Sequence, residues 1–212
     1  EGIHIPWNLH RETLKALREL EDKYAEQYPD GIDEMVQKEL GYNDIPALYK
    51  ALSGYQIDVV ALAIDKLRSG DGFINGDDTG VGKGRAAAAM ILWGTRNGKI
   101  PVFVSAKSDL YSDMYRDLKN IGHGDLKFAI TNHKVKVIDA SKRISEKGRL
   151  VLLNSKRDAD NLISKLASDG TMPNGEVALF TSYDQLKGPS DRRRALEGLL
   201  KTGKAMFILD ES

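Results

Sequence analysis

The sequence contains no cysteine, and this absence excludes disulfide bonds and thiolate metal sites. Its four histidines show neither an HExxH motif nor paired ligand spacing, so no metal site built on histidine is predicted. No apolar run is long enough to span a bilayer, and residues 1–7 lack the pattern of a signal or transit peptide. We therefore expect a cytoplasmic protein without membrane contact.

The net charge argues neither for nor against a nucleic-acid partner, because 31 Lys and Arg residues match 31 Asp and Glu residues. Any nucleic-acid contact must then come from a local basic face. With 212 residues, 41% of them hydrophobic, the chain is long enough for one principal core. Helical periodicity predicts helices from Leu14 to Tyr24, over 32–40 and from Ser53 to Leu67, with breaks at residues 28–31, 41 and 70.

Beyond Gly70 the pattern changes to short apolar runs that alternate with helices, which is typical of a parallel sheet with crossover helices. We predict strands at 73–75, 101–105, 127–130, 177–181 and 205–209. Helices are predicted at 83–96, 108–120, 157–168 and 191–200, and an inserted hairpin or extra strand at 135–138 and 150–153. The predicted organisation is thus a helical annex, residues 1–52, followed by an α/β lobe, residues 53–212.

A glycine-rich stretch, residues 77–84, lies between a predicted strand and an alanine-rich helix. Gly80 and Gly82 let the backbone N–H groups face inward, the helix N-terminus adds partial positive charge, and Lys83 can reach the β- and γ-phosphates of a nucleotide. We interpret it as a phosphate-binding loop in preference to a simple glycine-rich turn. Asp77 stands where such loops begin with Gly, and Gly84 replaces the hydroxyl residue that normally binds Mg²⁺, a role that Thr79 fills only in a differently curled loop.

An apolar run at 205–209 ends in Asp210 and Glu211. A parallel strand places such carboxylates at its carboxyl edge, where Asp210 can hold Mg²⁺ and Glu211 can orient the attacking water. The competing interpretation is a solvated acidic tail.

Together these motifs resemble the superfamily 2 helicases, and most closely the strawberry notch-like helicases, a family also found in phage and plasmid proteins. The resemblance covers residues 52–212 and rests on the segments 76–85, 111–118 with Ile121-Gly122, and 180–183. It implies a RecA-like P-loop NTPase lobe. In that family Gly and then Arg follow the phosphate-loop lysine, as Gly84 and Arg85 do here. The family's second ATPase motif continues past Asp-Glu-Ser, so we expect the chain to be truncated there.

By position, the resemblance implies an adenine-reading role for Gln56, whose side-chain amide offers a donor and an acceptor. An exposed polar residue on its helix is the alternative. The implied nucleotide-binding residues are Gln56, Thr79, Gly80, Val81, Gly82, Lys83, Gly84 and Arg85. The implied nucleic-acid contacts, for which strand-end capping is the alternative, are Ser105, Lys107, Thr181, Ser182 and Tyr183. Arg192–Arg194 are interpreted as a solvated face, and Trp7, Trp93 and Tyr115 as core residues.

The resemblance implies the ATP-binding first lobe of a helicase or DNA translocase, with ATP and Mg²⁺ as cofactors and DNA favoured over RNA as partner. A second RecA-like lobe of the same parent chain would complete the site, so we expect weak or moderate nucleotide binding and negligible hydrolysis from these residues alone. Two alternatives stay open. One is a P-loop kinase or metabolic ATPase, and the other is a non-catalytic nucleic-acid- or protein-binding module that retains the fold.

Overall fold

A computed structural model describes residues 7–75, 82–187 and 189–210, with the backbone alone described at 7–10. Its contacts divide the chain into two compact units, residues 1–86 and 87–212, and each unit is described by itself. The predicted boundary after residue 52 concerns folding domains and stays a prediction.

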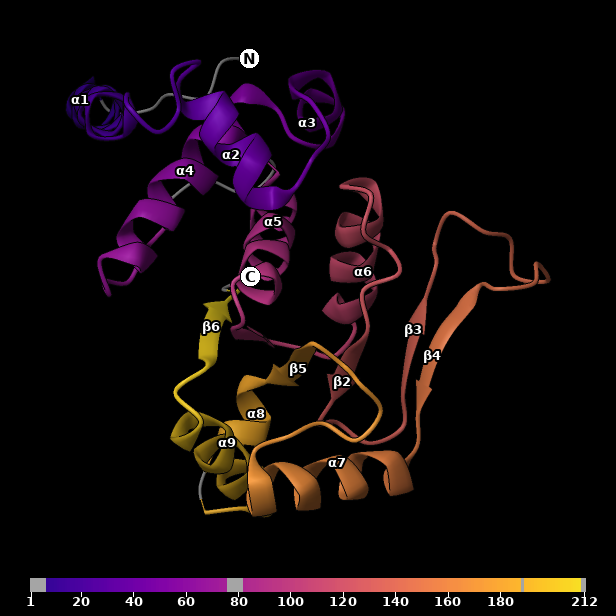
Figure 1. The fold of residues 1–212 in the computed structure, drawn as a ribbon. Helices are drawn as coiled ribbons and strands as arrows, with labels where there is room; N and C mark the ends of the chain where they lie inside the picture. The colour runs from indigo at the N-terminus through magenta and orange to yellow at the C-terminus, as the bar shows by residue number, and fades with distance from the viewer. Residues whose placement is uncertain (1–6, 76–81, 188, 211–212) are drawn as a thin grey trace. The chain divides into compact units, whose positions relative to one another are not determined.

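The first unit is helical, as predicted for the start of the chain (Figure 1). Its helices are α1 (Trp7–Tyr24), α2 (Ile32–Leu40), α3 (Ile45–Ala51), α4 (Gly54–Arg68) and the first turn of α5 (Lys83–Arg96). Buried aliphatic residues of α2, α3 and α4 form its core, including Val36, Leu40, Leu48, Ile57 and Ile64. Helix α3 was not predicted. Asp44 caps it by accepting a 2.7 Å hydrogen bond from the backbone N–H of Ala47.

The prediction of a strand at 73–75 is wrong. The structure describes these residues, and they form neither strand nor helix. Ile74 is 92% exposed, so its burial does not stabilise an extended segment there. The segment contains two apolar residues, Phe73 and Ile74, and two such side chains provide little apolar area for burial in a sheet.

The second unit contains a four-stranded parallel sheet with the order β2-β5-β1-β6 (Figure 1). The strands are β1 (Ile100–Ser105), β2 (Phe128–Ile130), β5 (Ala178–Ser182) and β6 (Ala205–Leu209). The helices that alternate with them are α6 (Leu110–Asn120), α7 (Lys156–Asp169), α8 (Tyr183–Leu186) and α9 (Asp191–Lys201). The predicted α/β fold with a parallel sheet after a helical segment is confirmed.

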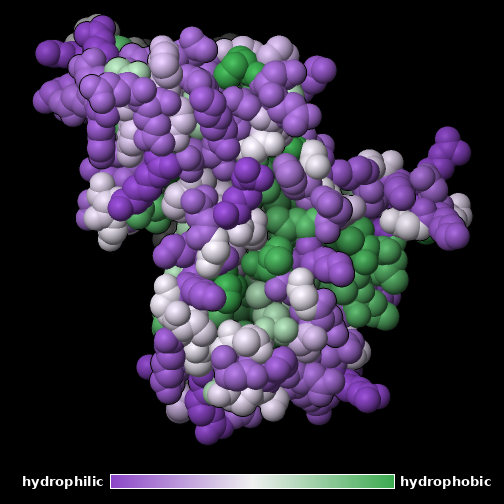
Figure 2. Space-filling model, in the orientation of Figure 1, coloured by the Kyte–Doolittle hydropathy of each residue, from purple (hydrophilic) through white to green (hydrophobic). Residues whose placement is uncertain are grey.

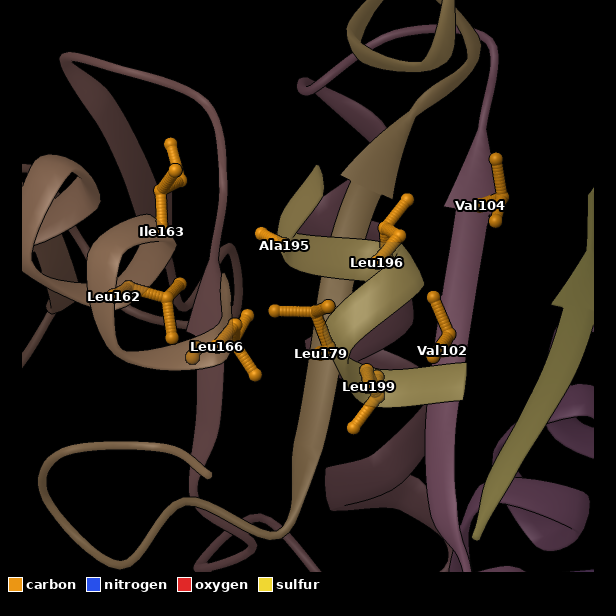
Figure 3. Packing of buried hydrophobic residues seen from close by; sticks show 10 residues of the cluster. Val102, Val104, Leu162, Ile163, Leu166, Leu179, Ala195, Leu196 and Leu199 are labelled. Carbon is orange, nitrogen blue, oxygen red and sulfur yellow. The ribbon is translucent and has the colours of Figure 1, made fainter. Parts of the chain in front are cut away.

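Helices α7 and α9 pack against β1 and β5 through aliphatic side chains (Figure 3). Leu166 on α7, Leu199 on α9 and Leu179 on β5 are fully buried in this cluster. The two helices approach closely at Gly198, where an added Cβ would lie 2.1 Å from the backbone oxygen of Leu166. A glycine is therefore required at this crossing.

An antiparallel hairpin, β3 (Val135–Ile138) and β4 (Leu150–Asn154), forms a separate two-stranded sheet, which confirms the predicted inserted hairpin. Polar contacts with Ser112 and Lys119 fix it to α6. The backbone N–H of Ile138 donates to Ser112 Oγ at 3.2 Å, and Lys119 Nζ lies 2.7 Å from Asp139 Oδ2. Val135 and Val137 are buried, so the hairpin has a defined inner face.

Candidate functional site

The turn before α5 contains the described end of the predicted phosphate loop. Thr79, Gly80 and Val81 lie outside the described residues, whereas Gly82 and Lys83 are described. Gly82 has φ = 81°, a left-handed conformation that favours glycine. A Cβ at this position would also lie 2.2 Å from Gln56 Nε2. Both observations explain why a glycine directly precedes the lysine.

Gln56 connects this turn to the start of α4. Its Nε2 donates to the backbone oxygen of Gly82 at 3.0 Å, and its Oε1 accepts from the backbone N–H of Ser53 at 2.9 Å. Ser53 Oγ in turn accepts from the backbone N–H of Gln56 at 3.4 Å, which completes a capping box. Gln56 is only 6% exposed, so the alternative of an exposed polar residue is wrong.

The adenine-reading role of Gln56 stays a prediction. A glutamine amide has two N–H donors and two acceptor lone pairs, and the contacts to Gly82 and Ser53 use one of each. Among the described residues, the contacts of this amide leave one donor and one acceptor, which is the pair an adenine edge requires. The Ser-x-x-Gln spacing in the sequence is the local signal for this capping box.

The first turn of α5 suits an anion. Lys83, Gly84 and Arg85 begin the helix, and no acidic residue stands in that turn. Backbone N–H groups at a helix N-terminus carry partial positive charge, and such termini bind phosphate readily. Arg85 is held at this position, because its Nη1 donates to the backbone oxygen of Ala51 at 3.4 Å. This cradle of glycine, lysine and helix terminus fits the phosphates of a nucleotide.

In the second unit, the parallel register brings the predicted strand-end residues to one edge of the sheet. Ser105 lies opposite Ser182, and Val104 lies opposite Leu209. Asp210 continues β6 by one residue, since its backbone N–H donates to the backbone oxygen of Val104 at 2.8 Å. Asp210 thus follows its strand at the carboxyl edge, as predicted, while Glu211 lies outside the described residues. The Mg²⁺-binding role of Asp210 stays a prediction.

The five predicted nucleic-acid contacts differ in accessibility. Ser105, Thr181 and Ser182 are at most 4% exposed, whereas Lys107 is exposed and Tyr183 is partly exposed. Ser105 Oγ donates to the backbone oxygen of Lys107 at 2.9 Å, in keeping with the strand-end capping alternative. Among these side chains, Lys107 presents the charge that a phosphate would meet.

A buried polar network lies behind this edge and was not predicted. The hydroxyls of Thr131 and Thr181 are 2.7 Å apart. Tyr111 donates to Asn132 Oδ1 at 2.7 Å, and Asn132 Nδ2 donates to Ser182 Oγ at 3.0 Å. Burial raises the pKa of the Tyr111 hydroxyl above its ordinary value. The Thr-Asn pair directly after the apolar run of β2 was the available sequence signal.

The arginine run of α9 is mostly solvated, as predicted. Arg193 pairs with Glu197 at 3.3 Å and Arg194 pairs with Asp191, all with side chains more than half exposed. Arg192 instead turns inward, where its Nη2 lies 2.7 Å from His133 Nε2.

The predicted core aromatic residues have different outcomes. Trp93 is only 4% exposed, as predicted, and Tyr115 is partly exposed. The side chain of Trp7 lies outside the described residues.

Among the helices that the structure describes, none has the length and apolar character required to cross a membrane.

A helix-initial lysine behind a left-handed glycine, in a chain with a parallel α/β sheet, is typical of P-loop NTP hydrolases. Residues 34–203 match the family model described as "P-loop containing NTP hydrolase pore-1". The chain belongs to this family, and the predicted RecA-like lobe of strawberry notch type is confirmed. It is 32% identical over 126 residues to human "Protein strawberry notch homolog 2", a match that covers 53% of this chain and 9% of the human protein. No solved structure matches.

Proposed function

We propose that this chain is the ATP-binding first lobe of a nucleic-acid-dependent ATPase, a helicase or DNA translocase. The buried Gln56–Gly82 hydrogen bond carries the proposal, because it fixes the left-handed turn directly before Lys83 and the α5 N-terminus. Membership in a P-loop NTP hydrolase family supports nucleotide hydrolysis as the reaction. The similarity to a strawberry notch homologue supports the narrower assignment.

In this proposal Lys83 and the first N–H groups of α5 hold the β- and γ-phosphates, and Gln56 pairs with the adenine edge. Asp210 supplies a carboxylate ligand for Mg²⁺, and Glu211 orients the attacking water. Bound Mg²⁺ would neutralise charge on the phosphates. Because Gly84 offers no hydroxyl, more of the ion's ligands come from water than in a loop with Ser or Thr at that position.

Hydrolysis also requires charge stabilisation of the transferred phosphoryl group, which related motors obtain from arginines of a second lobe. We propose that these arginines come from the same parent protein. The 212 residues alone should then bind Mg·ATP and hydrolyse it negligibly. Rapid phosphate release by this chain, abolished by Lys83→Ala, would contradict this part of the proposal.

The nucleic-acid contact is proposed at the carboxyl edge of the sheet, with Lys107 as its exposed cation and DNA preferred to RNA. Phosphate contacts of this kind position the polymer and carry little sequence information. Binding of labelled single-stranded DNA, duplex DNA and RNA is measured by fluorescence anisotropy, with and without a non-hydrolysable Mg·ATP analogue. Lys107→Ala should weaken DNA binding several-fold.

Lys99→Ala is the matched control, because Lys99 is an exposed lysine that precedes the amino end of the same strand. Its loss should leave DNA binding unchanged. Equal weakening by both substitutions would place the contact elsewhere. If neither DNA nor RNA binds, the proposed nucleic-acid dependence is wrong and only nucleotide hydrolysis remains proposed.

A further inference from the structure

The outer edge of β4 carries an aliphatic run that the fold leaves half exposed. Residues 150–153 read Leu-Val-Leu-Leu, and Leu150 and Leu153 are 50% and 52% exposed. Figure 2 shows a hydrophobic area over β3 and β4, with hydrophilic residues on the loop that joins them. Apolar side chains gathered on one exposed strand indicate an interaction surface.

The same strand has an open backbone edge. β4 pairs with β3 and with no other strand that the structure describes. The inner strand, β3, is the one that packs on α6. An exposed, apolar edge strand is a template for pairing with a further strand, and natural proteins normally protect such edges. Here the edge combines main-chain hydrogen-bonding groups with apolar side chains, the two components of strand addition.

The hairpin is held in place before any partner arrives. Its amino-terminal strand is fixed to α6 through Ser112 and through the Lys119–Asp139 ion pair. At the end of β4, Asn154 Nδ2 donates to the backbone oxygens of Ile130 and Asn132, at 2.9 and 2.7 Å. Because contacts fix β3 and the carboxyl end of β4, the hairpin loses little conformational freedom on binding, which favours affinity.

The charge around this edge is positive. Residues 134–160 contain four acidic residues, Asp139, Glu146, Asp158 and Asp160, and eight basic residues. The basic residues are Lys134, Lys136, Lys142, Arg143, Lys147, Arg149, Lys156 and Arg157. None of the eight forms an ion pair with a carboxylate in the part of the chain that the structure describes. Charge complementarity therefore favours an acidic partner.

Two acidic partners are conceivable on charge alone, a nucleic acid and an acidic peptide. Bases stack most strongly on Phe, Tyr and Trp, and none of these three residue types occurs between Phe128 and Phe180. An aliphatic strand with a free edge offers nothing specific to a phosphate backbone, whereas an extended peptide can use both its amides and its side chains. The observations therefore favour the peptide.

We propose that the outer edge of β4 binds an extended, acidic and aliphatic segment of a partner protein as an added β-strand. The added strand pairs with the backbone of residues 150–153, packs its apolar side chains beside Leu150 and Leu153, and places its carboxylates among the surrounding basic residues. This surface uses none of the residues proposed to bind the nucleotide, and the proposal does not depend on the proposed function.

A synthetic probe tests the proposal on the 212-residue chain. The probe is an end-capped, fluorescein-labelled peptide of about eight residues that alternates Glu and Val, long enough for one strand. A second peptide has the same sequence with alternate amides N-methylated, so that charge and side chains stay but strand pairing is lost. Binding is measured by anisotropy, and hydrogen exchange of residues 150–153 reports protection of the edge.

The decisive variant is Leu150→Lys/Leu153→Lys. It adds positive charge, which would strengthen a purely electrostatic contact with the acidic probe, but it removes the apolar contact. We expect binding to weaken about tenfold or more. Leu200→Lys, at a leucine of α9 that is 51% exposed, is the matched control and should leave binding unchanged. Circular dichroism confirms that each variant is folded.

Four results would overturn the proposal. Equal binding of the N-methylated peptide, or no binding of either peptide, would exclude strand addition at this edge. Binding of labelled single-stranded DNA that is lost in an Arg149→Glu variant, with no peptide binding, would assign the surface to nucleic acid. A doubled mass in sedimentation that the double leucine variant abolishes would assign it to a second copy of this chain.

Discussion

Substituting Gly82 by alanine tests the geometry of the turn before Lys83. Alanine at φ = 81° costs about 1–2 kcal/mol in the left-handed conformation. The added Cβ also displaces the Gln56 amide, which lies 2.2 Å from it, and each hydrogen bond lost contributes about 1 kcal/mol. Gly82→Ala should therefore lower the free energy of unfolding by about 2–4 kcal/mol, roughly the sum of both effects.

Gly70 provides the matched control for this substitution. Its φ is 82°, and apart from its chain neighbours no atom of the described residues lies within 4 Å of an added Cβ, so Gly70→Ala reports the backbone strain alone. The difference between the two variants then measures the displacement of Gln56. Urea unfolding followed by far-ultraviolet circular dichroism gives both values, and transitions from several probes must coincide before two-state fits are used.

A double-mutant cycle refines the test. In a Gln56→Ala background the added methyl of Gly82→Ala meets no amide, so its cost should fall to that of Gly70→Ala. The double variant should therefore be about 1–2 kcal/mol more stable than the sum of the single effects predicts. Additive effects, or equal costs for Gly82→Ala and Gly70→Ala in the parent chain, would refute the contact between Gln56 and this turn.

Three further predictions concern the second unit. Gly198→Ala places a methyl against the backbone of α7 and should cost about 1–3 kcal/mol in urea unfolding; an unchanged midpoint would contradict the close helix approach. Thr181→Val leaves the buried Thr131 hydroxyl unpaired and should cost about 1–3 kcal/mol, whereas Thr131→Val/Thr181→Val should be nearly neutral. Hydrogen bonds from Lys119, the larger cause, and from Ser141 lower the pKa of Asp139 to about 2. The stability that this carboxylate contributes to the folded state is therefore complete above pH ~4 and is lost toward pH ~2. Asp139→Asn should therefore reduce the acid sensitivity of unfolding in this window, and an unchanged pH profile would contradict the assignment.

Local signals in the sequence predicted most of the elements because each element follows its own pattern. The alanine-rich run after Lys83 forms α5, and the apolar run at 205–209 forms β6. The failures have local causes. Phe73 and Ile74 have β propensity, but Phe73 is only partly buried and Ile74 is exposed, so burial does not stabilise a strand there. Helix α3 has only seven residues, and its local signal is the N-cap Asp44 with a proline in the first turn.

For the candidate site, the sequence predicted the local motifs but not the contacts between residues far apart in the chain. Motif spacing identified Lys83 and Asp210, because a phosphate loop and a strand-end carboxylate are local features. The hydrogen bond from Gln56 to Gly82 joins residues 26 apart, and the Thr131–Thr181 pair joins residues 50 apart. Contacts of this range depend on how elements pack, and no local pattern specifies them. Burial of Ser105 and Thr181 likewise follows from the sheet order.

The most direct test of the central claim is calorimetric titration of Mg·ATP into the parent chain, Lys83→Ala and Lys66→Ala. Lys66 is an exposed lysine on α4 and controls for the loss of one positive charge. The account predicts saturable binding to the parent and Lys66→Ala, and affinity at least about tenfold weaker for Lys83→Ala. Equal affinities for all three proteins, or no binding to the folded parent, would contradict the assignment of Gly82, Lys83 and the α5 N-terminus as a nucleotide site.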